Sequence, residues 1–273
     1  MKIRNIRAIP VNLKPTPKTI PRVKPDPEAG RFVSPMDSYK REFPDHSWNA
    51  QWPTTACVVT ADNGIWGVGF APMSGPVCTI INDHFSEIVE GQDPLASEKI
   101  WDMMSKSTSA YGTSGLSSYA ISAVDNAIWD LKGKLLGYPV YKLLGGPVKD
   151  NIFCYASNTV LTYPTKDNID WFLELGFKAI KVFLRHGPEE GIEGLRKNEE
   201  IVANAREQIG PDIELAVDSW MSLNVEYAVR VVEALKPYKI KWLEDYFLPE
   251  DMVSYTNFRA RVPGQTLATG EHW

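Results

Sequence analysis

The chain has 273 residues, of which 44% are hydrophobic and 23% are charged, which is ordinary for a globular protein with one large or two modest domains. Its formal net charge of −5 excludes a basic field for nucleic acid or an anionic membrane surface, so a site for an anionic substrate needs a local cation. No run approaches the roughly 20 apolar residues that span a bilayer, and the three scattered cysteines fit a reducing compartment, so we expect a cytoplasmic protein.

The chain opens with the pattern of a small antiparallel sheet. Apolar residues alternate with polar ones over 2–13, which is typical of a strand. The runs 54–60 and 64–70 are rich in β-branched and aromatic residues and meet at Asp62-Asn63-Gly64. Because Asn-Gly is the strongest short hairpin signal, these two runs predict a hairpin.

A long stretch dense in proline, 14–53, lies between the first strand and the hairpin. Proline disfavours both helix and central strand, so a stretch of this length is either disordered or a functional lid. Its aromatic and cationic side chains favour a substrate lid, because disordered segments are poor in aromatic residues. We take Arg41 and His46 as candidate substrate contacts from this lid.

Three helices follow the hairpin and complete the first domain. Two are predicted over 78–90 and 94–106. The third has an apolar stripe from Ala120 to Leu135 and ends at Gly137, which suits a left-handed helix terminus. We therefore expect residues 1–148 to form an α+β capping domain that carries the lid.

Strands and amphipathic helices alternate strictly over 149–273. This alternation predicts a parallel sheet with right-handed crossovers, either an open doubly wound sheet or a TIM-type barrel. The predicted strands are 152–156, 179–184, 213–218, 240–244 and 266–271, and the predicted helices between them are 166–175, 194–209, 224–235 and 250–261.

Three acids end the last three predicted strands at nearly equal spacing: Asp218, Glu244 and Glu271. Each alone could cap the helix that follows its strand. Together they favour one oxygen-rich site for a hard divalent cation such as Mg²⁺. Successive strand ends converge on one pocket in a barrel but not readily in an open sheet, so the acids favour the (β/α) barrel.

The predicted barrel is incomplete in this chain. Five strand units do not close a barrel of eight strands, so we expect the sequence as given to be truncated after strand five. An incomplete barrel of five strands is also compatible with a non-catalytic remnant. The open edge of its sheet would be prone to association.

Four stretches resemble the enolase superfamily, in its mandelate racemase-like branch, over essentially the whole chain. The superfamily's α+β cap followed by a modified barrel is similar to the two patterns found above. The stretches are the helix Ala120–Lys134, the run Tyr141–Gly146, the strand segment Lys178–Lys181 and the three acids.

The resemblance implies a lyase of carbohydrate catabolism that acts on a small-molecule sugar acid. A Mg²⁺ held by Asp218, Glu244 and Glu271 would stabilise the enediolate that forms when the proton next to the substrate carboxylate is removed. Loss of the β-hydroxyl then gives a 2-keto-3-deoxy acid. The substrate implied is an aldonate of the L-rhamnonate type, with L-fuconate or L-lyxonate as alternatives. The full-length protein would be a homo-oligomer.

The remaining site residues are proposed from their positions at strand ends and beside the three acids. Lys181 would orient or neutralise the substrate carboxylate, and His272 would be a hydrogen-bond partner or acid; the alternatives are a strand-end cation and a packing histidine. Arg185 is a candidate substrate contact, or an exposed loop residue. The racemases' second lysine is replaced by Phe183, so we expect the general base on a His–Asp pair from later strands, outside this chain.

Overall fold

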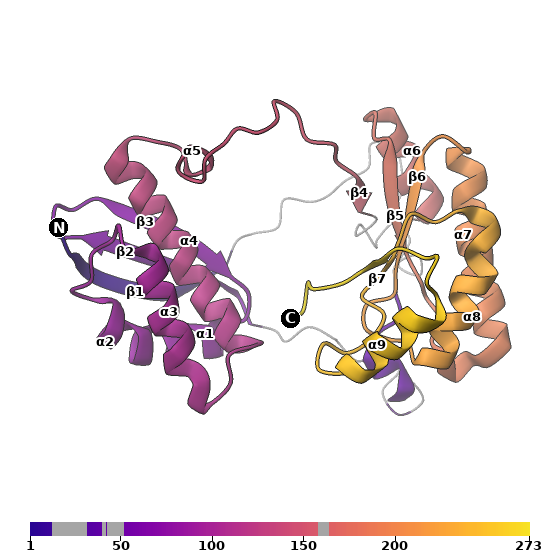
Figure 1. Ribbon diagram of the computed structural model, residues 1–273, viewed down its shortest axis with the longest axis horizontal. Coiled ribbons are helices and arrows are strands. Elements are labelled where there is room, and N and C mark those ends of the chain that lie inside the picture. The colour runs from indigo at the N-terminus through magenta and orange to yellow at the C-terminus, as the bar shows by residue number, and fades with distance from the viewer. Residues whose placement is uncertain (13–31, 40–41, 43–51, 158–163) are drawn as a thin grey trace. The chain divides into compact units, whose positions relative to one another are not determined.

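The computed structural model describes residues 1–12, 32–39, 42, 52–157 and 164–273 (Figure 1). Contacts divide the chain into two compact units. The first comprises Met1–Pro15 with Asn49–Ile152, and the second comprises Thr16–Trp48 with Phe153–Trp273. Part of the stretch interpreted as a lid is therefore grouped with the second unit. Among the described residues, no helix is both long and apolar enough to cross a membrane.

The first unit contains an antiparallel sheet in the order β1-β2-β3, made of β1 (Ile3–Val11), β2 (Thr54–Ala61) and β3 (Trp66–Ala71). The hairpin predicted between β2 and β3 is present. Its turn is closed by a hydrogen bond from the Gly64 amide to the Ala61 carbonyl oxygen, and Gly64 has a φ of 86°. That left-handed conformation is the one that favours glycine.

The long helix α4 packs directly on the backbone of β3. A Cβ atom on Gly69 would lie 2.0 Å from the Ala123 carbonyl oxygen, and one on Gly67 would lie 2.1 Å from that of Ala127. The two glycines therefore set how closely helix and sheet approach. The helical segments of this unit are α1 (Ser74–Ile80), the π-helical turn η2 (Ile81–Phe85), α2 (Ser86–Val89), α3 (Ser97–Ser107), the 3₁₀ turn η3 (Thr108–Ala110), α4 (Leu116–Leu136) and α5 (Val140–Leu143).

Side chains cover both outer edges of this sheet. Asn82 in η2 accepts from the Ala8 amide at 2.8 Å and donates to the Ala8 carbonyl oxygen at 2.9 Å. On the opposite edge the Val68 amide donates to the Asp130 carboxylate at 2.8 Å. Unpaired edge groups are templates for pairing with another chain, so these bonds satisfy the edge groups of Ala8 and Val68 within the unit.

The second unit is a five-stranded parallel sheet in chain order, β4-β5-β6-β7-β8, with helices between successive strands (Figure 1). The predicted βα alternation is confirmed. The strands are β4 (Ala156–Ser157), β5 (Ala179–Phe183), β6 (Glu214–Asp218), β7 (Leu243–Glu244) and β8 (Leu267–Ala268). The helices are α6 (Thr165–Glu174), α7 (Gly191–Ile209), α8 (Val225–Leu235) and α9 (Met252–Arg261), with short 3₁₀ turns η1 (Pro35–Tyr39), η4 (Pro188–Glu190) and η5 (Lys236–Tyr238).

Three strands differ clearly from the prediction. The predicted strand 152–156 is shifted and shortened to 156–157, and the predicted strands 240–244 and 266–271 are shortened to 243–244 and 267–268. Glu271 consequently lies in the turn after β8.

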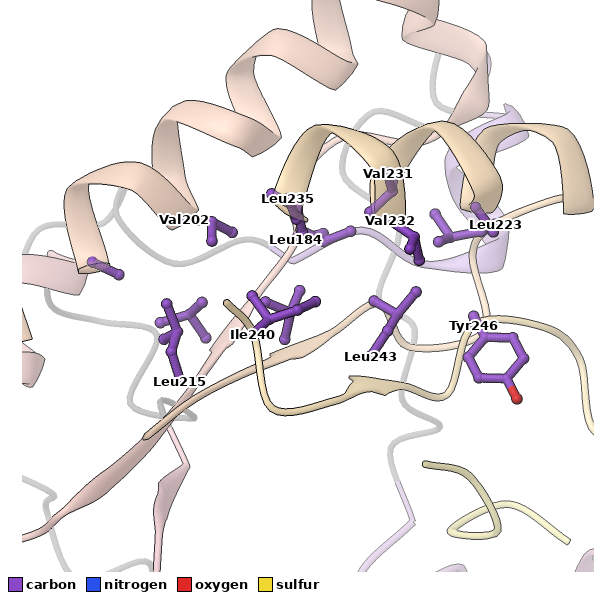
Figure 2. Packing of buried hydrophobic residues seen from close by; sticks show 14 of the residues in the cluster. Leu184, Val202, Leu215, Leu223, Val231, Val232, Leu235, Ile240, Leu243 and Tyr246 are labelled. Carbon is purple, nitrogen blue, oxygen red and sulfur yellow. The ribbon is translucent and has the colours of Figure 1, made fainter. Parts of the chain in front are cut away.

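Alternate strand residues pack against the helices and form the core of this unit. Figure 2 shows Leu215 and Leu243 from the strands facing Val202 of α7 and Val232 of α8. Because successive side chains of a strand point to opposite faces, the residues between these apolar ones lie on the other face of the sheet. That other face carries Lys181, Asp218 and Glu244.

Candidate metal and substrate site

Asp218 and Glu244 are paired in register where β6 and β7 end. Residues in register on parallel strands project to the same face, so the two carboxylates lie side by side at the carboxyl edge of the sheet. Carboxyl ends of parallel strands are where α/β folds place their ligand sites. The two acids are therefore brought together as the spacing in the sequence predicts.

Lys181 of β5 bridges these two carboxylates. Its Nζ lies 2.9 Å from Asp218 Oδ2 and 2.6 Å from Glu244 Oε1. The Lys181 side chain is 5% exposed, and those of Asp218 and Glu244 are 4% and 14% exposed. Water screens such a group poorly, so the single ammonium offsets part of the repulsion between the two carboxylates.

Burial and the shared ion pair act in opposite directions on the protons of these groups. Burial raises the pKa of Asp218 to about 6, although Lys181 and the Trp220 amide both favour its charged form. Burial alone would lower the pKa of Lys181, but the charges and hydrogen bonds of Asp218 and Glu244 outweigh it and raise that pKa. Lys181 therefore keeps its proton.

Two tryptophans hold the carboxylates in place. The backbone amide of Trp220 donates to Asp218 Oδ1 at 3.0 Å, and the indole Nε1 of Trp242 donates to Glu244 Oε2 at 2.7 Å. Both oxygens of each carboxylate thus have a partner, which fixes the orientation of the two acids.

Glu271 lies apart from the register pair. It is exposed, and it comes three residues after Ala268, the register partner of Glu244. Ligand atoms of Glu271, Asp245 and His272 lie within 4.8 Å of one another. Glu271 also lines a pocket of about 320 Å³ together with Glu244 and Asp245. The structure therefore places the third acid on the rim of a pocket that it shares with the second.

His272 is held by two residues that the sequence did not single out. The indole Nε1 of Trp220 donates to His272 Nε2 at 2.8 Å, and Asp245 Oδ2 lies 3.6 Å from the same nitrogen. Asp245 is 3% exposed, and burial raises its pKa. Trp220 and Asp245 have φ values of 35° and 40°, which non-glycine residues rarely adopt and which tend to cluster at functional sites. No residue pattern in the sequence predicts these backbone angles.

The loop after β5 carries Arg185 and is tied down by Asn198 of α7. Asn198 Oδ1 accepts from the amides of Arg185 and His186 at 3.0 and 3.2 Å, and its Nδ2 donates to the His186 carbonyl oxygen at 2.8 Å. Arg185 also donates to Thr165 Oγ1 at 3.0 Å. Asn198 interrupts the apolar stripe between Leu195 and Val202, a signal that could have identified it from sequence. Arg41 and His46 lie outside the described residues.

Both units match known families. Residues 50–145 match the family described as mandelate racemase / muconate lactonizing enzyme, N-terminal domain, and residues 166–273 match that described as enolase C-terminal domain-like. The chain belongs to the mandelate racemase-like branch of the enolase superfamily. The expected superfamily fold, a cap domain and a parallel α/β barrel region, is thereby confirmed.

Relatives within the superfamily include sugar-acid dehydratases. The chain is 45% identical over 220 residues to an L-rhamnonate dehydratase of Saccharopolyspora erythraea, an alignment that covers 80% of this chain and 54% of the relative. A crystal structure of L-rhamnonate dehydratase from Gibberella zeae aligns with a TM-score of 0.80 at 28% identity over 99% of this chain and 64% of that one. A second structure, of rhamnonate dehydratase from Gibberella zeae complexed with Mg, aligns with a TM-score of 0.78 at 28% identity over 99% and 66%. The chain thus spans about half the length of the curated relative.

Proposed function

We propose that this chain supplies the metal-binding part of a Mg²⁺-dependent sugar-acid dehydratase. The observation that carries the proposal is the register pair of Asp218 and Glu244, held at the carboxyl edge of a parallel sheet with Glu271 on the rim of the adjoining pocket. The similarity to L-rhamnonate dehydratases supports the same conclusion.

The donor set fits a hard cation. Asp218, Glu244 and Glu271 offer carboxylate oxygens, the ligands that Mg²⁺ prefers. Asp218, which is buried, and Glu244, which is partly buried, are both oriented by donors, which lowers the entropy lost when an ion binds. A bound Mg²⁺ would stabilise negative charge that develops on the substrate carboxylate as its α-proton leaves.

Lys181 acts in this proposal as a fixed cation. A lysine whose pKa is raised by two carboxylates is a poor base, because it has no free amine near neutral pH. It would instead attract and orient the carboxylate of the substrate. Arg185, presented on the loop that Asn198 holds, would contact substrate hydroxyls. His272 on the rim would exchange hydrogen bonds with the substrate or donate a proton to the leaving hydroxyl.

The proposed substrate is an aldonate of the L-rhamnonate type, and the proposed product is a 2-keto-3-deoxy acid. L-fuconate and L-lyxonate are the alternative substrates. The proposal gives the role of proton-abstracting base to none of the residues described above. A metal-binding chain without turnover is the competing function, favoured by this lack of an assigned base.

Metal binding and turnover test these functions separately. We expect calorimetry to show Mg²⁺ binding to the chain, lost in Asp218→Asn and Glu244→Gln and retained in Glu214→Gln, whose carboxylate pairs with Lys241 on the surface. Equal binding by all variants would contradict the site. Incubation of the complete protein with Mg²⁺ and a panel of aldonates should yield a 2-keto acid. Binding without any product would favour the non-catalytic function.

A further inference from the structure

Trp220 contacts three separate parts of the proposed site. Its backbone amide donates to Asp218 Oδ1, and its indole donates to His272 Nε2. Its ring also packs on Phe32, with ring centroids 4.1 Å apart. Trp220 thus contacts a proposed metal ligand, the imidazole and the segment 32–39 together.

The backbone around Trp220 is held in a costly conformation. Trp220 and Met221 have φ values of 35° and 60°, a left-handed conformation that residues other than glycine rarely adopt. Flanking hydrogen bonds impose it: Ser219 donates to the Glu244 carbonyl oxygen at 3.1 Å, and Leu223 donates to that of Tyr246 at 3.0 Å. Because these bonds hold the backbone in this conformation, they also fix the direction in which the indole points.

The indole bond sets the proton arrangement of His272. An indole N–H can only donate, so His272 Nε2 must accept and the ring proton lies on Nδ1. The two rings lie nearly parallel, with an interplanar angle of 22° and centroids 6.2 Å apart. The orientation of the imidazole therefore follows that of Trp220.

The segment 32–39 docks against Trp220 through Phe32. The Val33 amide donates to the Leu184 carbonyl oxygen at 3.0 Å, and the Val33 side chain is fully buried in the core of the second unit. Phe32 also packs on Phe183, with centroids 5.3 Å apart. Ser38 donates to Glu189 Oε1 at 2.8 Å. Phe32 thus brings a segment more than 100 residues earlier in the sequence against the ring that orients His272.

We propose that Trp220 is a positioning residue that couples the docking of the segment 32–39 to the orientation of His272. When Phe32 packs on the indole, the indole N–H is aimed at His272 Nε2 and the imidazole takes one tautomer. When Phe32 is withdrawn, the indole loses its packing contact with the phenyl ring and the imidazole samples both tautomers. The role of His272 in substrate binding rests on the proposed function, but the coupling itself does not.

Imidazole nitrogen signals test the coupling in the chain without metal or substrate. In ¹⁵N-histidine-labelled protein at about pH 8, above the usual imidazole pKa, wild-type His272 should show one protonated nitrogen, Nδ1, and one hydrogen-bonded acceptor nitrogen, Nε2. Trp220→Phe keeps a ring but deletes the donor, so both signals should move toward the average of the two tautomers. Phe32→Leu should move them in the same direction, although the substituted side chain would not touch the imidazole.

The controls separate coupling from general damage. Phe32→Tyr keeps the ring and should leave the His272 signals at their wild-type values. Tyr39→Phe changes an exposed ring in the same segment and should also leave them unchanged. Assignment comes from His272→Gln, and hydrogen exchange of the Val33 amide reports whether the segment stays docked if Phe32→Leu lowers stability.

Two results would overturn the coupling: unchanged His272 signals in Trp220→Phe, or unchanged signals in Phe32→Leu while Trp220→Phe moves them. Failure of the proposed function has a different signature, since absent Mg²⁺ binding or aldonate turnover would leave these nitrogen shifts as expected.

Discussion

Asp218 and Glu244 are register partners on neighbouring strands, and one ammonium, that of Lys181, lies within 3 Å of both carboxylates. The pair therefore does not need a metal to stay together. It needs one positive charge, and Lys181 supplies it from the adjacent strand. The stability of the site should accordingly depend on Lys181 more strongly when no divalent ion is present.

Lys181→Met tests this dependence. The variant leaves two buried carboxylates facing each other, and loss of one partner of a buried ion pair costs about 3–5 kcal/mol. We expect a lowered melting temperature in EDTA and a larger rise on adding Mg²⁺ than in the wild type, because the ion then replaces the missing charge. Lys241→Met is the matched control: its pair with Glu214 is more than 40% exposed and should cost about 1 kcal/mol or less. Equal losses in the two variants would contradict the bridging role.

The raised pKa of Asp218 predicts how stability changes with pH. Its pKa rises from 3.8 to about 6 on folding, so the folded state binds this proton more tightly than the unfolded state. Stability should therefore fall as the pH rises from about 4 to about 6, by up to about 3 kcal/mol. Asp218→Asn lacks this titration. The free energy of unfolding of Asp218→Asn minus that of the wild type, from urea titrations at each pH, should grow over this window. A difference that shrinks would mean that the charge of Lys181 affects the pKa of Asp218 more strongly than burial does.

The same carboxyl should give Mg²⁺ binding the opposite trend. A ligand must lose its proton before it binds the ion, so affinity should weaken as the pH falls below about 6. Calorimetry of the wild-type chain at pH 5 and pH 7 measures the trend. Affinity that is the same at both values would indicate that Asp218 is not a ligand.

Periodicity and turn chemistry predicted most of the architecture because both act locally. The Asn63-Gly64 turn specifies its hairpin without help from the rest of the chain. The stripe from Ala120 to Leu135 marks the buried side of α4, and the alternation of strands and helices marks the parallel sheet. The acids Asp218 and Glu244 were found for the same reason, since each ends a recognisable strand.

The contacts within the site depend on pairings between distant segments and could not be predicted in this way. Which residue lies opposite Lys181 depends on the register of three strands, and Trp220 reaches His272 only because its backbone takes a left-handed angle imposed by β7. The end of β8 was placed too late in the chain because Thr269 and Gly270 extend an apolar run without continuing the ladder. Sequence therefore located the acids but not their partners.

Gly69→Ala should disrupt the first unit. Its Cβ would lie 2.0 Å from the Ala123 carbonyl oxygen, and backbone cannot move aside as a flexible side chain can. We expect α4 to be displaced from β3 at a cost of about 3 kcal/mol or more. The control, Gly264→Ala, meets no atom within 4 Å and should leave the melting temperature nearly unchanged. Thermal unfolding followed by circular dichroism compares the two, and a stable Gly69→Ala chain would show that the close helix–sheet approach is dispensable.

Asn198→Ala should release the loop that carries Arg185. Asn198 is 1% exposed and satisfies the amides of Arg185 and His186 with one oxygen, so its removal leaves two donors without their partner, at a cost of about 1–3 kcal/mol. We expect faster hydrogen exchange at both amides and little change in the amides of β5. Asn198→Asp keeps the acceptor but loses the bond to the His186 carbonyl oxygen, so it should protect the two amides better than alanine does. Lys197→Ala, on the exposed side of the same helix, controls for helix propensity. If the amides of Arg185 and His186 exchange at the same rate in all three variants, the loop is held by other contacts, and Asn198 does not position Arg185.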